Sequence, residues 1–64
     1  MLTAIKKARL IAGMSQGELA RQMGLSQGAV SLWEQGKTSP SAPKLKRLAE
    51  VLNTTVDELL KEVS

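Results

Sequence analysis

The chain of 64 residues contains no cysteine, no histidine, no tyrosine and no phenylalanine. Without cysteine, neither a disulfide nor a thiolate metal site can support the fold, which fits a reducing compartment. Without histidine, the usual general base and the commonest metal ligand are missing. No apolar run approaches the roughly 18 residues that span a bilayer, and no secretory signal pattern opens the chain. We therefore expect a soluble cytoplasmic domain that is not an enzyme and needs no metal or cofactor.

Charge is distributed unevenly along the chain. The net charge is +3, but residues 1–47 hold eight Lys or Arg against two Glu, whereas residues 48–64 hold one Lys against four acidic residues. This asymmetry favours a basic face that meets a polyanion and an acidic end held away from it. The alternative is that small domains are often basic without binding nucleic acid, and composition alone does not separate the two.

Helical patterns recur five times along the chain, whereas strand signals are weak. The first helix is predicted over about residues 2–12 and is followed by Gly13, which suits a left-handed cap. Its apolar stripe consists of Leu2, Ile5, Ala8 and Ala12. The sequence Ser15-Gln16-Gly17-Glu18 fits a capping box, which opens a second helix that ends at Gly24. The inward-facing residues of this second helix are predicted to be Leu19, Ala20 and Met23.

Three further helices are predicted in the rest of the chain. Ser26 caps a third helix that reaches about Gln35, and residues 37–40 form a loop. Ser41 caps a fourth helix, whose apolar stripe is Leu45, Leu48, Ala49 and Leu52. Thr55-Val56-Asp57-Glu58 is another capping box, and the stripe of the fifth helix is Val56, Leu59, Leu60 and Val63. A chain this short builds one small core, so residues 1–64 are predicted to form a single all-α domain, a compact five-helix bundle.

The joint between the second and third helices consists only of Gly24-Leu25-Ser26. Such a short turn prevents antiparallel packing and forces a steep crossing, which is the geometry of a helix-turn-helix. Ala20 supplies the small residue that a close crossing requires. Trp33 could stack on an unpaired base, but its position on the third helix favours packing in the core.

The stretch "SQGELARQMGLSQGAVSLWEQGKTSPS" resembles the helix-turn-helix of lambda-repressor-like regulators, the phage Cro and cI type. The resemblance runs from about Ile5 to Leu60 and ends in "LAEVLNTTVDELL", which is similar to the last two helices of that family. It implies a sequence-specific transcriptional regulator of phage-infected or bacterial cells that acts on the nucleoid. A phage-type repressor that binds double-stranded, palindromic operator DNA as a homodimer is expected.

The outward face of the third helix carries almost no charge. Successive residues lie about 100° apart, so Val30 and Trp33 define the buried direction and Gly28 and Ser31 point the opposite way. Short polar and apolar groups suit the base edges of a major groove, where phosphates would repel a carboxylate. The alternative is an ordinary small-polar surface. The resemblance implies base reading by residues of this face, with Gln27 as the leading reader, then Gly28, Ser31 and Leu32, and with Ala29 either packing or touching the groove edge.

Phosphate contacts are expected from other parts of the domain. Gln16 opens the second helix, where free amides and the helix dipole favour an anion. The resemblance implies that this glutamine binds phosphate and can buttress the first glutamine of the third helix, and that Lys37 and Thr38 touch phosphate. Further phosphate-binding candidates are Gly17, Ser26, Arg21, Lys6 and Lys44. Simple solvation is the alternative for the three basic residues among them.

Arg9 and Glu34 both lie beside an apolar stripe of their helices, where an unpaired charge is costly. The resemblance implies that they meet as a partly buried ion pair joining the first and third helices. Leu10, Val51 and Val63 are candidate dimer contacts, although isolated exposed apolar residues are common. An antitoxin or adaptor of the same fold, with a protein as its main partner, is the alternative function.

Overall fold

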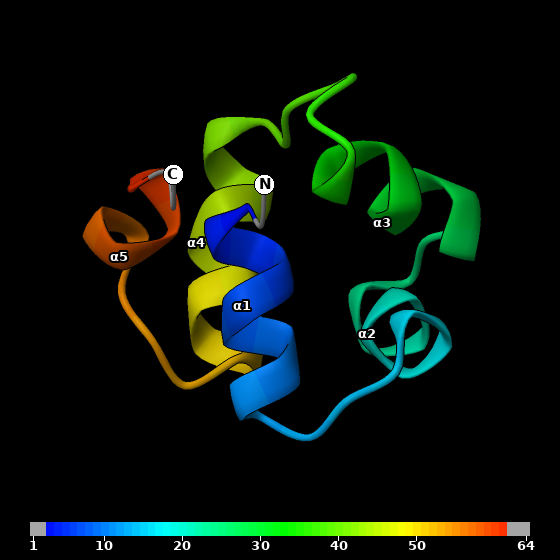
Figure 1. Ribbon diagram of the computed structural model, residues 1–64, viewed down its shortest axis with the longest axis horizontal. Helices are drawn as coiled ribbons and strands as arrows, with labels where there is room; N and C mark the ends of the chain where they lie inside the picture. Colours follow the sequence, from blue (N-terminus) through cyan, green and yellow to red (C-terminus); the bar gives the residue numbers. More distant parts are fainter. Residues whose placement is uncertain (1–2, 62–64) are drawn as a thin grey trace.

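The computed structural model describes residues 3–61, which form five helices and no strand. The helices are α1 (Ala4–Ile11), α2 (Gln16–Met23), α3 (Gln27–Glu34), α4 (Ala42–Val51) and α5 (Val56–Leu60). In Figure 1, α2 and α3 occupy one side of the domain and α5 the opposite side, with α1 and α4 between them. The predicted all-α five-helix architecture is therefore confirmed for this part of the chain. No helix within it is long and apolar enough to cross a membrane.

All five helices contribute apolar side chains to one core. Leu19, Val30 and Leu48 are fully buried and come from α2, α3 and α4. The other buried apolar residues are Ile5, Ala20, Trp33, Ala49, Leu52 and Leu59. Trp33 is only 7% exposed, so the prediction that it packs in the core is confirmed. Because α3 buries Val30 and Trp33, its opposite face is turned to the outside.

Serine and threonine side chains cap four of the helices. The hydroxyls of Ser15 and Thr55 accept hydrogen bonds from the amides of Glu18 and Glu58, at 3.0 and 3.1 Å. Ser26 accepts from the Ala29 amide at 3.3 Å. These three caps were predicted, and each satisfies an amide that the helix leaves free. The two predicted capping boxes are only half formed, because neither Glu18 nor Glu58 bonds the amide of its capping residue. A fourth cap, in which Thr3 accepts from the Lys6 amide at 3.2 Å, moves the start of α1 past the predicted residue 2.

The predicted cap at Ser41 is wrong in one respect. Ser41 occupies the N-cap position of α4, but its side chain makes no capping hydrogen bond. Pro43 lies in the first turn of α4 and has no amide proton, so one of the donors that a cap would satisfy is missing.

Two residues of the predicted apolar stripes are exposed. Ala12 lies just beyond the last residue of α1, where the helical periodicity no longer places a side chain over the core. Leu60 is 63% exposed because α5 is only five residues long and turns Leu59, not Leu60, into the core. The predicted stripe residues Leu2 and Val63 lie outside the described residues.

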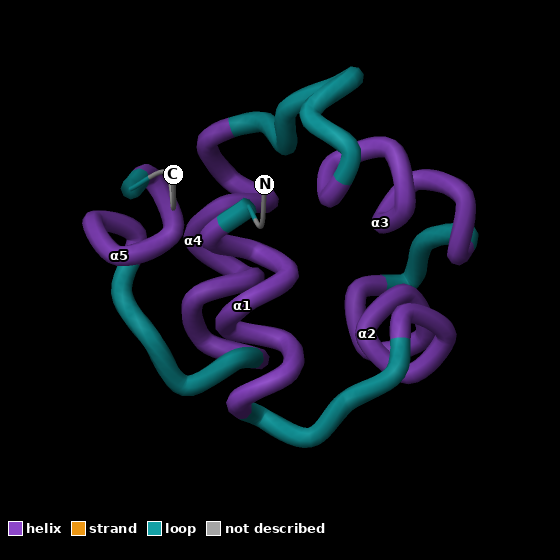
Figure 2. The backbone as a smooth tube through the Cα atoms, viewed as in Figure 1, coloured by secondary structure: helices purple, strands orange, loops and turns teal. Residues whose placement is uncertain are grey.

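The turn between α2 and α3 is as short as predicted (Figure 2). Gly24 ends α2 in the left-handed conformation, with φ of 70°. The Leu25 amide then donates to the Ala20 carbonyl at 2.8 Å, which closes the turn. Ala20 is buried at the crossing, and α2 and α3 make the most extensive contact of any helix pair. The turn therefore sets the direction in which α3 leaves α2.

Replacing Gly24 by alanine is expected to lower the free energy of unfolding by about 1–2 kcal/mol, because a Cβ is unfavourable at positive φ. The space around Gly24 is open, so the cost comes from the backbone alone. Gly28→Ala is the matched control, since Gly28 is in a right-handed helix with room for a Cβ, and it is expected to stabilise by up to about 1 kcal/mol. Urea unfolding followed by Trp33 fluorescence measures both, and a Gly24→Ala variant as stable as the parent would contradict the assignment.

Candidate DNA interface

A buried ion pair connects α1 to α3. The Nε and Nη2 atoms of Arg9 donate to the two carboxylate oxygens of Glu34, at 2.6 and 3.1 Å. The third donor, Nη1, bonds the carbonyl oxygen of Met14 at 2.7 Å. Arg9 and Glu34 are 7% and 8% exposed, respectively. One guanidinium thus holds α3 and the backbone that leads into α2, with the two-point geometry that makes a buried pair favourable.

The hydrogen-bond network continues from Glu34 to the surface. Glu34 Oε1 also accepts from Gln16 Nε2 at 3.0 Å. Gln16 Oε1 in turn accepts from Gln27 Nε2 at 3.4 Å. The structure therefore brings together the first residues of α2 and α3, and it ties both to the buried pair.

The outward face of α3 is the surface that the sequence singled out for base reading. Gln27, Gly28 and Leu32 are exposed, whereas Ala29 and Ser31 are partly buried. The Ser31 hydroxyl accepts a hydrogen bond from Gln35 Nε2 at 2.8 Å, so its own proton remains available to a ligand. The only carboxylate of this helix, that of Glu34, points inward to Arg9.

The predicted phosphate-binding residues divide into groups. Gln16, Gly17 and Gln27 lie together: a Cβ built on Gly17 would come within 3.7 Å of Gln27 Oε1. Ser26 uses its hydroxyl to cap α3. Lys37 and Thr38 are exposed beyond the other end of α3, where both of their amides bond the Leu32 carbonyl. The remaining candidates are distributed over three helices, with Arg21 and Lys44 exposed on α2 and α4 and Lys6 partly buried on α1.

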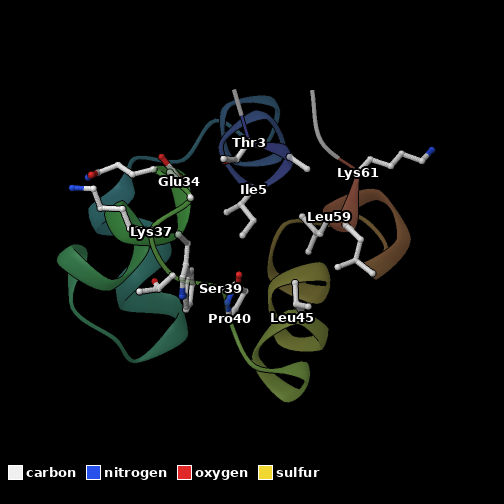
Figure 3. Close-up of a pocket in the computed structure, with 15 residues that line it drawn as sticks. Thr3, Ile5, Glu34, Lys37, Ser39, Pro40, Leu45, Leu59 and Lys61 are labelled. Atoms are coloured by element: carbon white, nitrogen blue, oxygen red, sulfur yellow. The ribbon is translucent and has the colours of Figure 1, made fainter. Parts of the chain in front are cut away.

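A separate groove of about 890 Å³ lies between the N-terminal part of α1, the loop after α3, and the helices α4 and α5. Ile5, Leu45 and Leu59 point into it, and Ser39 and Pro40 lie along one side (Figure 3). Lys37 is directed away from these apolar residues in the same view. None of the five predicted base readers lines the groove, so it is distinct from the outward face of α3.

Sequence reasoning missed three of the polar contacts at this site. The bond that Gln35 donates to Ser31 joins residues four positions apart at the end of α3, and that spacing could have indicated it. The bonds from Arg9 to the Met14 carbonyl and from Gln16 to Glu34 have no such local signal. The first joins α1 to the loop that follows it, and the second depends on how α2 and α3 are placed relative to one another.

A helix-turn-helix family model matches residues 5–59 of the chain. The chain belongs to the Cro/cI-type helix-turn-helix family. In this family context, α2 and α3 are the two helices of the motif, and α3 is its second helix. The resemblance stated from the sequence is therefore confirmed.

Relatives with the same motif are described as transcription regulators. The chain is 36% identical over 56 residues to the HTH-type transcriptional activator BcrR of Enterococcus faecalis, and the match covers 88% of this chain but 28% of BcrR. It is 34% identical over 59 residues to an uncharacterized HTH-type transcriptional regulator of Archaeoglobus fulgidus, covering 92% and 84% of the two chains. The crystal structure of a hypothetical transcription factor, NHTF from Neisseria, superposes with a TM-score of 0.82 at 30% identity, covering 92% of this chain and 68% of the other.

Removing the carboxylate of Glu34 is expected to destabilise the domain strongly. Glu34→Ala would leave Arg9 charged and buried without its partner, at a cost of about 3–5 kcal/mol. The matched control is Glu58→Ala, because Glu58 pairs with Lys61 at 3.1 Å but both side chains are more than half exposed. That surface pair is expected to contribute at most about 1 kcal/mol. Thermal melts of the two variants test the contrast, and equal melting temperatures would show that the buried pair adds nothing.

Proposed function

We propose that this domain is a sequence-specific regulator of transcription that inserts α3 into the major groove of double-stranded DNA. The observation that carries the proposal is the exposed, carboxylate-free face of α3, with Gln27 at its N-terminal end bonded to Gln16. Membership of the Cro/cI-type family and relatives named as transcription regulators support it.

The side chains on this face match the chemistry of base edges. The Gln27 amide combines one acceptor with donors, the combination that bonds the N6 and N7 positions of adenine. Leu32 presents methyl groups suited to contact with the methyl group of thymine, and the Ser31 hydroxyl has a proton to donate. Gly28 contributes no side chain, so the readout depends mainly on Gln27.

Contacts with the phosphate backbone are proposed for residues at both ends of α3. Gln16, Gly17 and Ser26 lie at its N-terminal end, and the exposed Lys37 and Thr38 follow its C-terminal end. Arg21, Lys6 and Lys44 are further candidates. The acidic residues Glu50, Asp57 and Glu58 are exposed on or near α4 and α5. This distribution fits DNA on the α3 side and an acidic end held away from it.

A single domain of this size reads only a few base pairs, so we propose that it acts as a homodimer on a palindromic operator. The two half-sites are then expected about one helical turn apart. Of the candidate dimer contacts, Leu10 is 53% exposed, Val51 packs partly against the core, and Val63 lies outside the described residues. Repression by occupying an operator is the finer form of the proposal, although BcrR is named as an activator.

Selection of bound duplexes from a random DNA pool, followed by titration at several salt concentrations, tests the proposed function directly. The expected result is a palindromic consensus that binds at least about a thousandfold more tightly than random DNA, with a steep loss of affinity as salt rises. Weak binding with no consensus sequence would contradict the proposal and favour a protein partner.

Gln27→Ala is expected to reduce discrimination at one base position by about 1–3 kcal/mol, since it removes the amide that contacts the base edge. The measurement is a set of titrations with the selected operator and with duplexes that carry the other three base pairs at each position. Uniform weakening on all of these duplexes would instead make Gln27 a backbone contact.

Lys37→Ala serves as a contrasting variant. Because a lysine beside phosphate reads no base, its loss is expected to weaken binding to all duplexes by the same factor. The slope of the logarithm of affinity against the logarithm of salt concentration should also fall by about 1. A salt slope equal to that of the parent domain would remove Lys37 from the phosphate contacts.

A further inference from the structure

We infer that the buried Arg9–Glu34 pair acts on base reading as well as on folding: through Gln16, it sets which atoms the Gln27 side chain presents to DNA. Glu34 and Gln16 are then positioning residues for Gln27. The inference rests on the proposed function, because it assumes that Gln27 contacts a base edge. It concerns the hydrogen-bond polarity of that contact.

The donor-to-acceptor direction of these hydrogen bonds is set first at Arg9, whose guanidinium has only donors. It bonds both oxygens of Glu34, at 2.6 and 3.1 Å, so both of these oxygens are acceptors. A neighbour at hydrogen-bond distance from either oxygen must therefore donate to it. Gln16 lies 3.0 Å from Glu34 Oε1 and therefore turns its Nε2 inward.

The orientation of the Gln16 amide determines which atom of Gln27 can bond it. With Nε2 directed at Glu34, Gln16 turns its Oε1 toward α3, where only a donor can bond it. Gln27 supplies its Nε2 at 3.4 Å. If the Gln16 amide were reversed, its Oε1 would face Glu34 Oε1, and two acceptors cannot bond each other. If the Gln27 amide were reversed, its Oε1 would likewise face Gln16 Oε1. Each amide therefore has one favoured direction.

The result is a reading side chain with a preset arrangement of donor and acceptor. One N–H of Gln27 is engaged by Gln16, which leaves the second N–H and Oε1 for a base edge. Adenine offers an acceptor at N7 and a donor at N6, which matches that pair of groups. Gly17 accommodates this arrangement, because a Cβ at that position would already lie 3.7 Å from Gln27 Oε1 and a longer side chain would compete for the same space.

Burial decreases along the network from Arg9 and Glu34 to Gln27, which suits a buried pair that orients an exposed base reader. Arg9 and Glu34 are almost fully buried, Gln16 is partly buried and Gln27 is exposed. Hydrogen bonds at the inner end are shielded from water, which strengthens them. Gln27, at the outer end, is the most accessible side chain of the network.

The decisive variant is the double substitution Arg9→Met/Glu34→Leu. Apolar residues of similar size can replace a buried ion pair without loss of stability, so the fold is expected to persist, as a thermal melt and Trp33 fluorescence will show. Gln16 then has no carboxylate to orient it. Discrimination between base pairs, at the position identified with Gln27→Ala, is expected to fall roughly three- to tenfold. This is a part of the about 5- to 150-fold discrimination that a two-bond contact with a base supplies. Glu58→Gln, which removes only the exposed pair with Lys61, is the control and should leave discrimination unchanged.

Gln16→Met tests the next step without disturbing the ion pair. Loss of a phosphate contact weakens binding to all duplexes equally, so the ratio between the best and the substituted base pair is the informative quantity. That ratio is expected to fall at the same single position. Combining Gln16→Met with Arg9→Met/Glu34→Leu should reduce it no further than Gln16→Met alone, because both changes interrupt one path.

The outcomes separate this inference from the proposed function. If Gln27→Ala loses discrimination but the ion-pair variant keeps it, the inference is overturned and Gln27 remains a base reader. A uniform loss of affinity in Gln16→Met, with an unchanged ratio, also overturns it and leaves Gln16 as a phosphate contact. If Gln27→Ala itself leaves discrimination unchanged, the proposed base reader is wrong and the inference fails with it. Should the double variant not fold, Glu34→Gln replaces it, because it keeps the size of the side chain and gives Gln16 a partner that can donate as well as accept. An unchanged ratio in that variant overturns the inference.

Discussion

The bidentate ion pair between Arg9 and Glu34 is the interaction that connects the first three helices inside the core. The Arg9 guanidinium bonds a side chain of α3 and a carbonyl just before α2, so it fixes two segments relative to α1 at once. The core has only nine buried apolar residues among those described, so burying two charged side chains within it carries a large desolvation cost. They are stable there because each of the three guanidinium nitrogens bonds an acceptor, and because neither group is left buried alone.

The pair also explains why the outer surface of α3 can be free of carboxylate. Glu34 is the only acidic residue of that helix, and Arg9 draws it inward to the side that carries Val30 and Trp33. The remaining outward groups are amide, hydroxyl and alkyl. Structural and functional requirements are therefore met by the same residue: the charge that holds α3 in place is kept away from the face proposed to meet DNA.

Local features of the sequence predicted much of the fold. Ser15, Ser26 and Thr55 cap helices as expected, Gly24 takes the left-handed turn, and Val30 and Trp33 face the core. Each of these depends on residues close together in the chain. Predictions were wrong at element ends, where Ala12 and Leu60 are exposed and Ser41 makes no capping bond. Periodicity carries no information on where a helix stops contacting its neighbours, and Pro43 changes the donors available at the start of α4.

By itself, the sequence determined the helical class, the short turn at Gly24-Leu25-Ser26 and the uncharged character of one face of α3, because side-chain spacing and glycine conformation act over a few residues. The tertiary structure decided which polar groups meet. Gln16 and Glu34 are 18 positions apart, and Arg9 and Glu34 are 25 apart. Their hydrogen bonds exist only because the core holds α1, α2 and α3 at one set of distances, and no pattern within a single helix encodes those distances.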